Sequence, residues 1–133
     1  MPYILSFVKS VEILDSDQYI NDCCIGGDIV LQKVLPGLEA RYEDIESNQE
    51  DWGWFAWFEH SRVKLAVDVY CNDAKTGDFQ IHLTSRRPRF LLSDRVEDTP
   101  ELEDLCKLMV SQLQAWDAAS LRVERVNENY MPV

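Results

Sequence analysis

The chain has 133 residues, 46% of them hydrophobic and 28% charged, with a formal net charge of −11 at pH 7. That length and balance are typical of a single globular domain, residues 1–133, with its own core, and they exclude a disordered chain. The acidic excess disfavours binding to nucleic acid or to an anionic membrane surface, because both are negatively charged.

No apolar stretch approaches the roughly 20 residues that a membrane-spanning helix needs. The N-terminal sequence MPYILSFVKSVEIL lacks the basic start, the clean apolar stretch and the small-residue cleavage site of a signal peptide. We therefore expect a cytoplasmic protein that does not bind membranes.

The four cysteines and two histidines do not follow a metal-ligand pattern. No C-x-x-C motif occurs, and His60 and His82 are far apart in the sequence. Cys23 and Cys24 are neighbours, and adjacent residues rarely reach disulfide geometry. We expect reduced, buried thiols, no metal site and no cofactor.

The first part of the chain predicts a strand and two helical segments. Residues 3–14 mix β-branched and aromatic side chains with polar ones, which favours a first strand. Residues 15–17 (DSD) suit the start of a short helix that ends near the glycine pair 26–27. Apolar residues at 31, 35, 38, 42 and 45 then form a helical stripe, which Pro36 either kinks or begins.

The segment from Trp52 to Arg89 predicts three antiparallel strands. It is rich in aromatic residues, and residues 51–93 carry a net charge of +1, whereas residues 1–50 and 94–133 carry −7 and −5. A turn over residues 59–62 would place Phe58 opposite Val63, and the turn formers at 72–78 close the next hairpin.

Side-chain alternation gives this sheet two faces. The core face, which the helices are expected to cover, holds Trp54, Ala56, Phe58, Val63, Leu65, Val67, Val69, Phe79, Ile81 and Leu83. The second face holds Phe55, Trp57, Glu59, Lys64, Ala66, Asp68, Tyr70, Gln80, His82 and Thr84. Cys71 falls on the opposite face from His82, which removes this pair as a nucleophile and its base.

The C-terminal part predicts a helix and a strand. Thr99 suits the cap, Pro100 the first helical position, and the apolar residues from Leu102 to Trp116 form one stripe. Residues 121–126 (LRVERV) predict a last strand. The expected fold is α+β, an antiparallel sheet of about four to five strands with the 52–89 meander at its centre and two main helices packed on one face.

The second face supplies the candidate binding residues, Phe55, Trp57, Lys64, Asp68, Tyr70 and His82. With Phe58 opposite Val63, Trp57 opposes Lys64 and would form a cation–π pair. Asp68 lies across from His82 or one diagonal away, and we expect its carboxylate to raise the pKa of the imidazole, although such pairs are more often structural.

The stretch SRRPR is the only positive cluster, and its arginines are candidates for an anion site: Arg86, Arg87 and Arg89. Alternatively, these arginines pair with the acidic flanks or protect an edge strand from aggregation.

No catalytic motif such as G-x-S-x-G or a phosphate-binding loop occurs, so we assign no catalytic residue and favour a protein that is not an enzyme. The enzyme alternative would need a pocket on the second face around His82 and Asp68.

In size, charge and element order the chain resembles small acidic secretion chaperones and some immunity proteins that neutralise basic bacterial toxins. Secretion chaperones of that type end with a further helix, for which this C-terminus is too short. The prediction is therefore an inhibitor, immunity-type protein or adaptor that binds a basic protein partner, with acidic helices steering it and Trp57, Phe55 and Tyr70 supplying contact area. A secretion-chaperone-like homodimer, formed through the aromatic second face, is the other alternative.

Overall fold

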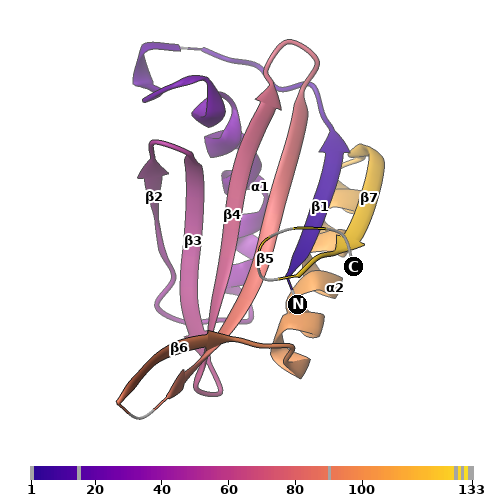
Figure 1. Ribbon diagram of the computed structural model, residues 1–133. Helices are drawn as coiled ribbons and strands as arrows, with labels where there is room; N and C mark the ends of the chain where they lie inside the picture. The colour runs from indigo at the N-terminus through magenta and orange to yellow at the C-terminus, as the bar shows by residue number, and fades with distance from the viewer. Residues whose placement is uncertain (1, 15, 90, 128, 130, 132–133) are drawn as a thin grey trace.

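The structure is a computed structural model that describes residues 2–14, 16–89, 91–127, 129 and 131. Two short 3-10 turns, Ser16–Gln18 and Asp22–Cys24, lie near its N-terminus. The described residues also form seven strands and two α-helices, which follow one another along the chain as shown in Figure 1: β1 (Tyr3–Val8), α1 (Gly27–Glu39), β2 (Glu46–Glu50), β3 (Gly53–His60), β4 (Val63–Asp73), β5 (Asp78–Arg89), β6 (Leu92–Val96), α2 (Pro100–Ala115) and β7 (Ala119–Arg125).

The seven strands form one antiparallel sheet in the order β2-β3-β4-β5-β1-β7, and β6 pairs with the far end of β5. Both helices lie behind the sheet in Figure 1, so they cover the same face. The expected α+β class is confirmed. The sheet is larger than the expected four to five strands.

β2 and β6 were not predicted from the sequence, because they carry little apolar alternation. β2 (ESNQE) is mostly exposed on both faces, and it forms because it satisfies the backbone groups along one side of β3. β6 forms because β5 continues past Ser85 to Arg89 and the following residues, 92–96, pair with this end of β5.

The N-terminal helical predictions are partly wrong. Asp15 lies outside the described residues, and the expected short helix is replaced by the two 3-10 turns. α1 begins earlier than expected, after Gly26, whose left-handed φ of 80° turns the chain and whose carbonyl accepts the first helical hydrogen bonds. Pro36 lies inside the last turn of α1, where it neither begins the helix nor stops it before Glu39.

The predicted faces of the central strands are confirmed, although the predicted first turn is not. The turn contains only Ser61 and Arg62, both with positive φ (53° and 65°), as in a type I′ hairpin. His60 therefore opposes Val63, two positions from the expected register. A shift of two residues preserves side-chain parity, so the ten predicted core-face residues are all buried or half-buried.

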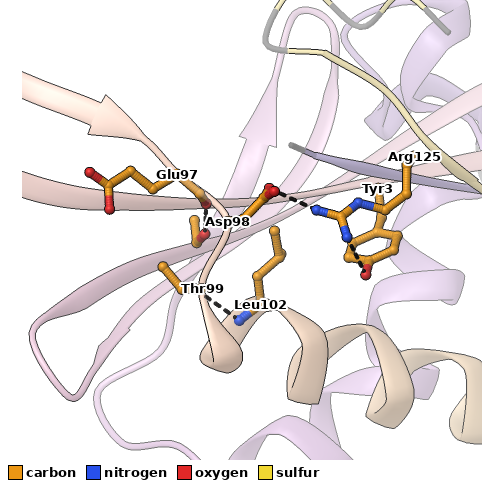
Figure 2. A network of polar contacts seen from close by, with 7 residues as sticks. Tyr3, Glu97, Asp98, Thr99, Leu102 and Arg125 are labelled. Carbon is orange, nitrogen blue, oxygen red and sulfur yellow. Dashed lines mark hydrogen bonds and ion pairs between the residues drawn. The ribbon is translucent and has the colours of Figure 1, made fainter. Parts of the chain in front are cut away.

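The predicted C-terminal helix is confirmed as α2. The hydroxyl of Thr99 accepts a hydrogen bond from the backbone N–H of Leu102 at 3.1 Å, which caps the helix. Figure 2 shows how this helix start is tied to the two terminal strands. Arg125 of β7 donates to the Asp98 carboxylate (2.7 Å) and to the Tyr3 hydroxyl of β1 (3.0 Å).

The four thiols are all free; Cys24, Cys71 and Cys106 are buried, but Cys23 is exposed, contrary to expectation. Within the described ranges, none of the helices has the length and apolar character needed to cross a membrane.

Candidate binding site on the second face

The second face is hollowed into a cavity of about 500 Å³ near the end of the sheet that carries β6. Five carboxylates and two cationic side chains contribute to its wall, so the cavity has an excess of negative charge. The lining residues are Asp44, Glu46, Trp57, Phe58, Glu59, Lys64, Leu65, Ala66, Asp68, Thr84, Arg86 and Asp94.

The β5–β6 hairpin supplies one wall of the cavity. Arg86 of β5 lies opposite Lys64 of β4 on one side and Val96 of β6 on the other. The Lys64 ammonium forms an ion pair with Asp94 of β6 at 2.6 Å. This ion pair links β6 to β4. It also means that the positive charge of Lys64 is already paired with a carboxylate of the cavity wall.

Trp57 is the exposed aromatic residue of the cavity, with 42% of its surface accessible. Its ring stacks on Phe55 at a centroid distance of 4.0 Å, and its Nε1–H donates to Oδ1 of Asp68 at 3.0 Å. The expected pairing of Trp57 with Lys64 is wrong, because the shorter turn places Trp57 opposite Ala66 and Lys64 opposite Glu59.

Asp68 is half-buried in the cavity wall. Burial raises the pKa of its carboxyl from 3.8 to about 6, against the smaller lowering effects of the Trp57 hydrogen bond and the Arg86 charge. The carboxyl is therefore mostly ionised at pH 7 and becomes protonated in mildly acidic solution.

His82 lies directly opposite Asp68, as expected, but its titration is opposite to the expected one. Burial lowers the pKa of the imidazole from 6.5 to about 4, so the ring is neutral at pH 7. The imidazole ring packs against the Tyr70 ring at a centroid distance of 4.4 Å, and the Tyr70 ring packs against Trp52 at a centroid distance of 5.1 Å. Desolvation by burial is therefore the cause of the lowered pKa.

The candidate binding residues thus divide into two groups. Trp57, Lys64 and Asp68 line the cavity, whereas Tyr70 and His82 belong to the neighbouring aromatic stack. Phe55 is only 4% exposed and lies beneath Trp57, so its contribution to binding would be to hold the indole in place.

The three arginines of the positive cluster do not converge on one point. Arg86 lines the cavity, Arg87 forms an ion pair with Glu97 at 3.0 Å, and Arg89 donates from Nε to the Ser93 carbonyl at 2.9 Å. The latter two contacts lie within the β5–β6 hairpin, in agreement with the alternative that these residues pair internally.

Sequence reasoning missed the part of the cavity wall that comes from outside the predicted meander. Asp44 and Glu46 lie at the end of the predicted helical stripe, where no site residue was expected, and Asp94 belongs to a strand that was not predicted. Thr84 and Arg86 follow from continuing the β5 alternation. No three His, Cys, Asp or Glu side chains are grouped as metal ligands in the part of the chain that the structure describes.

Comparisons of this chain with protein families, with curated proteins and with solved structures found no match. The fold and the site therefore define it only as an α+β protein whose antiparallel sheet has helices on one face and an acidic cavity on the other.

Proposed function

We propose that the protein binds a basic partner protein through its second face, with a positively charged side chain of the partner entering the cavity. The observation that carries this proposal is the pairing of Trp57, 42% exposed, with the carboxylate of Asp68 inside an acidic cavity. An indole face attracts a guanidinium or ammonium group, and a carboxylate accepts its hydrogen bonds.

The charge of the whole chain supports the same partner. A net charge of −11 draws a basic protein toward the surface and speeds its encounter, an effect that salt weakens. Long-range attraction would then be supplied by the surface as a whole and specificity by the cavity. An inhibitor, an immunity-type protein or an adaptor fits this mode of binding.

The test uses a short labelled peptide rich in arginine and lysine, with a neutral peptide of the same length as a reference. Binding is measured by fluorescence anisotropy for the wild type and for Asp68→Asn. Since a hydrogen bond to a charged group is worth about 1.5–3 kcal/mol, the substitution should weaken binding about tenfold or more.

Asp104→Asn is the matched control, because Asp104 is exposed on α2 and the substitution changes the net charge equally. We expect Asp104→Asn to change the affinity by no more than about twofold, because salt screens a distant, exposed charge. Equal weakening by the two substitutions would mean that the peptide follows total charge and not the cavity, and the proposal would fail.

Catalysis by Asp68 is a second candidate, supported by the pKa of about 6 of this carboxyl and by the neighbouring Thr84 in the cavity. A carboxyl that titrates near the working pH is suited to general acid–base chemistry. His82, the other residue of the expected catalytic pocket, is not among the lining residues. A panel of ester, phosphate and glycoside substrates tests this candidate, and activity that survives Asp68→Asn would refute it.

A further inference from the structure

The two lateral edges of the sheet, β2 and β7, differ in what covers them. The Gln49 side chain of β2 accepts a hydrogen bond from the backbone N–H of Ile20 at 2.9 Å and donates to the Gln18 carbonyl at 3.1 Å. The N-terminal segment therefore covers part of β2. Among the described residues, β7 pairs only with β1, and it forms the opposite border of the sheet in Figure 1.

The backbone of β7 directs a row of hydrogen-bonding groups away from the sheet. The N–H of Val126 donates to the Pro2 carbonyl at 3.0 Å, which points this residue toward the neighbouring strand. Residues alternate along the regular part of this antiparallel ladder, so Val123 and Arg125 direct their N–H and C=O groups outward, whereas the register shifts between Arg122 and Ala119. Such an edge is a template for a further strand.

The side chains of β7 suit a strand of the same sequence. Val123 lies on the core face, opposite Leu5, yet it is 46% exposed. Arg122 and Glu124 lie on the second face and form an exposed ion pair with each other at 2.7 Å. The positive charge thus lies on one side of Val123 and the negative charge on the other.

We propose that β7 pairs antiparallel with β7 of a second copy of this chain, about a two-fold axis at Val123. In this register Arg122 faces the partner's Glu124, Glu124 faces the partner's Arg122, and the two Val123 side chains cover each other. The outward backbone groups of the two Val123 residues then pair with each other across the axis.

Two alternative registers place like charges opposite each other. A two-fold axis perpendicular to the sheet joins the two sheets with their core faces on the same side. Side chains paired across the axis must then point to the same face, so one residue of β7 lies opposite its own copy. An axis at Arg122 would oppose two arginines, and an axis at Glu124 would oppose two glutamates. Directly opposed like charges destabilise a strand pair. An axis at Leu121 would place Arg122 opposite the partner's Ser120, without an opposite charge. The axis at Val123 is the one that brings opposite charges together.

The same operation on β2 is unfavourable. An axis at Asn48 would place Glu46 opposite the partner's Glu50 twice. β7 is locally balanced, since Glu124 offsets Arg122 and Asp98 binds Arg125 at 2.7 Å. The strong acidity of the chain therefore does not extend to the β7 edge.

This dimer is independent of the proposed function. The cavity is lined by residues of β3, β4, β5 and β6 and of the α1–β2 region, and β1 lies between β5 and β7. Pairing of β7 leaves both cavities open. One short strand pair buries less than the roughly 1,200–2,000 Å² of a stable interface, so the dimer is weak and depends on concentration.

Sedimentation velocity over a range of protein concentrations tests the proposal with a charge exchange. Arg122→Glu or Glu124→Arg alone places like charges opposite each other twice and should weaken dimerisation about tenfold. The double variant Arg122→Glu/Glu124→Arg restores opposite charges and should return to within about threefold of the wild type. A wild type that stays monomeric throughout, or a double variant that dimerises no better than the single ones, would overturn the proposal.

Disulfide trapping tests the register itself. In a Cys23→Ser background, Val123→Cys should give a covalent dimer on mild oxidation, because the two side chains face each other across the axis. Arg122→Cys is the matched control and should not, because it faces the partner's Glu124. Trapping through position 122 and not through 123 would contradict the proposed axis. Unchanged thermal unfolding of each variant shows that its fold is intact.

Discussion

Replacing Asp68 by asparagine should make the protein more stable near neutral pH while weakening its binding of basic peptides. The folded-state pKa of this carboxyl is about 6, above its ordinary value of 3.8. An acid with a raised pKa binds its proton more tightly in the folded state. Its ionisation therefore costs no stability below pH 3.8. The cost grows as the pH rises from 3.8 to about 6 and is constant at higher pH.

The size of the effect follows from this difference. The rise of the pKa from 3.8 to about 6, at about 1.36 kcal/mol for each pKa unit, corresponds to about 3 kcal/mol of lost stability above pH 7. Asparagine removes this cost and keeps an oxygen that can accept the hydrogen bond from Trp57. A neutral acceptor is weaker than a carboxylate by about 1 kcal/mol, so the expected net gain is about 2 kcal/mol.

Urea denaturation of the wild type and of Asp68→Asn, measured from pH 4 to pH 8, tests this reasoning. The difference in the free energy of unfolding should rise across the window between 3.8 and 6 and level off above it. Using the difference between the two proteins cancels the titration of the other carboxylates. A variant that is less stable than the wild type at pH 8, or a difference independent of pH, would refute the argument that Asp68 is held ionised at a cost.

Two further predictions concern His82 and the start of α2. Because burial lowers the pKa of His82 to about 4, the neutral ring stabilises the fold above pH 6.5, and this contribution is lost as the pH falls from 6.5 toward 4. Unfolding of His82→Gln should vary less over that window, whereas an imidazole NMR signal that titrates near pH 6.5 would contradict the burial. Thr99→Ala should lower the free energy of unfolding by about 1 kcal/mol through loss of the helix cap, and Thr76→Ala in an exposed turn should have little effect. Equal effects of these two substitutions in chemical denaturation would show that the Thr99 cap does not stabilise the fold.

The central strands could be predicted because alternation is insensitive to errors of two residues. The expected Phe58–Val63 pairing was wrong, yet every residue of the two faces was assigned correctly. The same error removed the expected Trp57–Lys64 contact, because a cross-strand partner depends on the exact turn. Faces follow from parity, whereas contacts follow from register.

The rest of the site depends on tertiary structure that local patterns do not encode. β6 and its Asp94 come from a strand whose pairing is set by the continuation of β5. The titration of His82 was predicted from its neighbour Asp68, but the stack of Tyr70 and Trp52 that buries the ring joins two strands and a turn. Burial of this kind appears only when the sheet is assembled.

The most direct test of cation binding on the second face is an NMR titration of the ¹⁵N-labelled protein with an arginine-rich peptide. The indole N–H signal of Trp57 should shift and saturate, because that group bonds to Asp68 within the cavity. The shift should be much smaller in Asp68→Asn. Shifts confined to the exposed acidic residues of α1 and α2, with the Trp57 signal unmoved, would contradict the proposal.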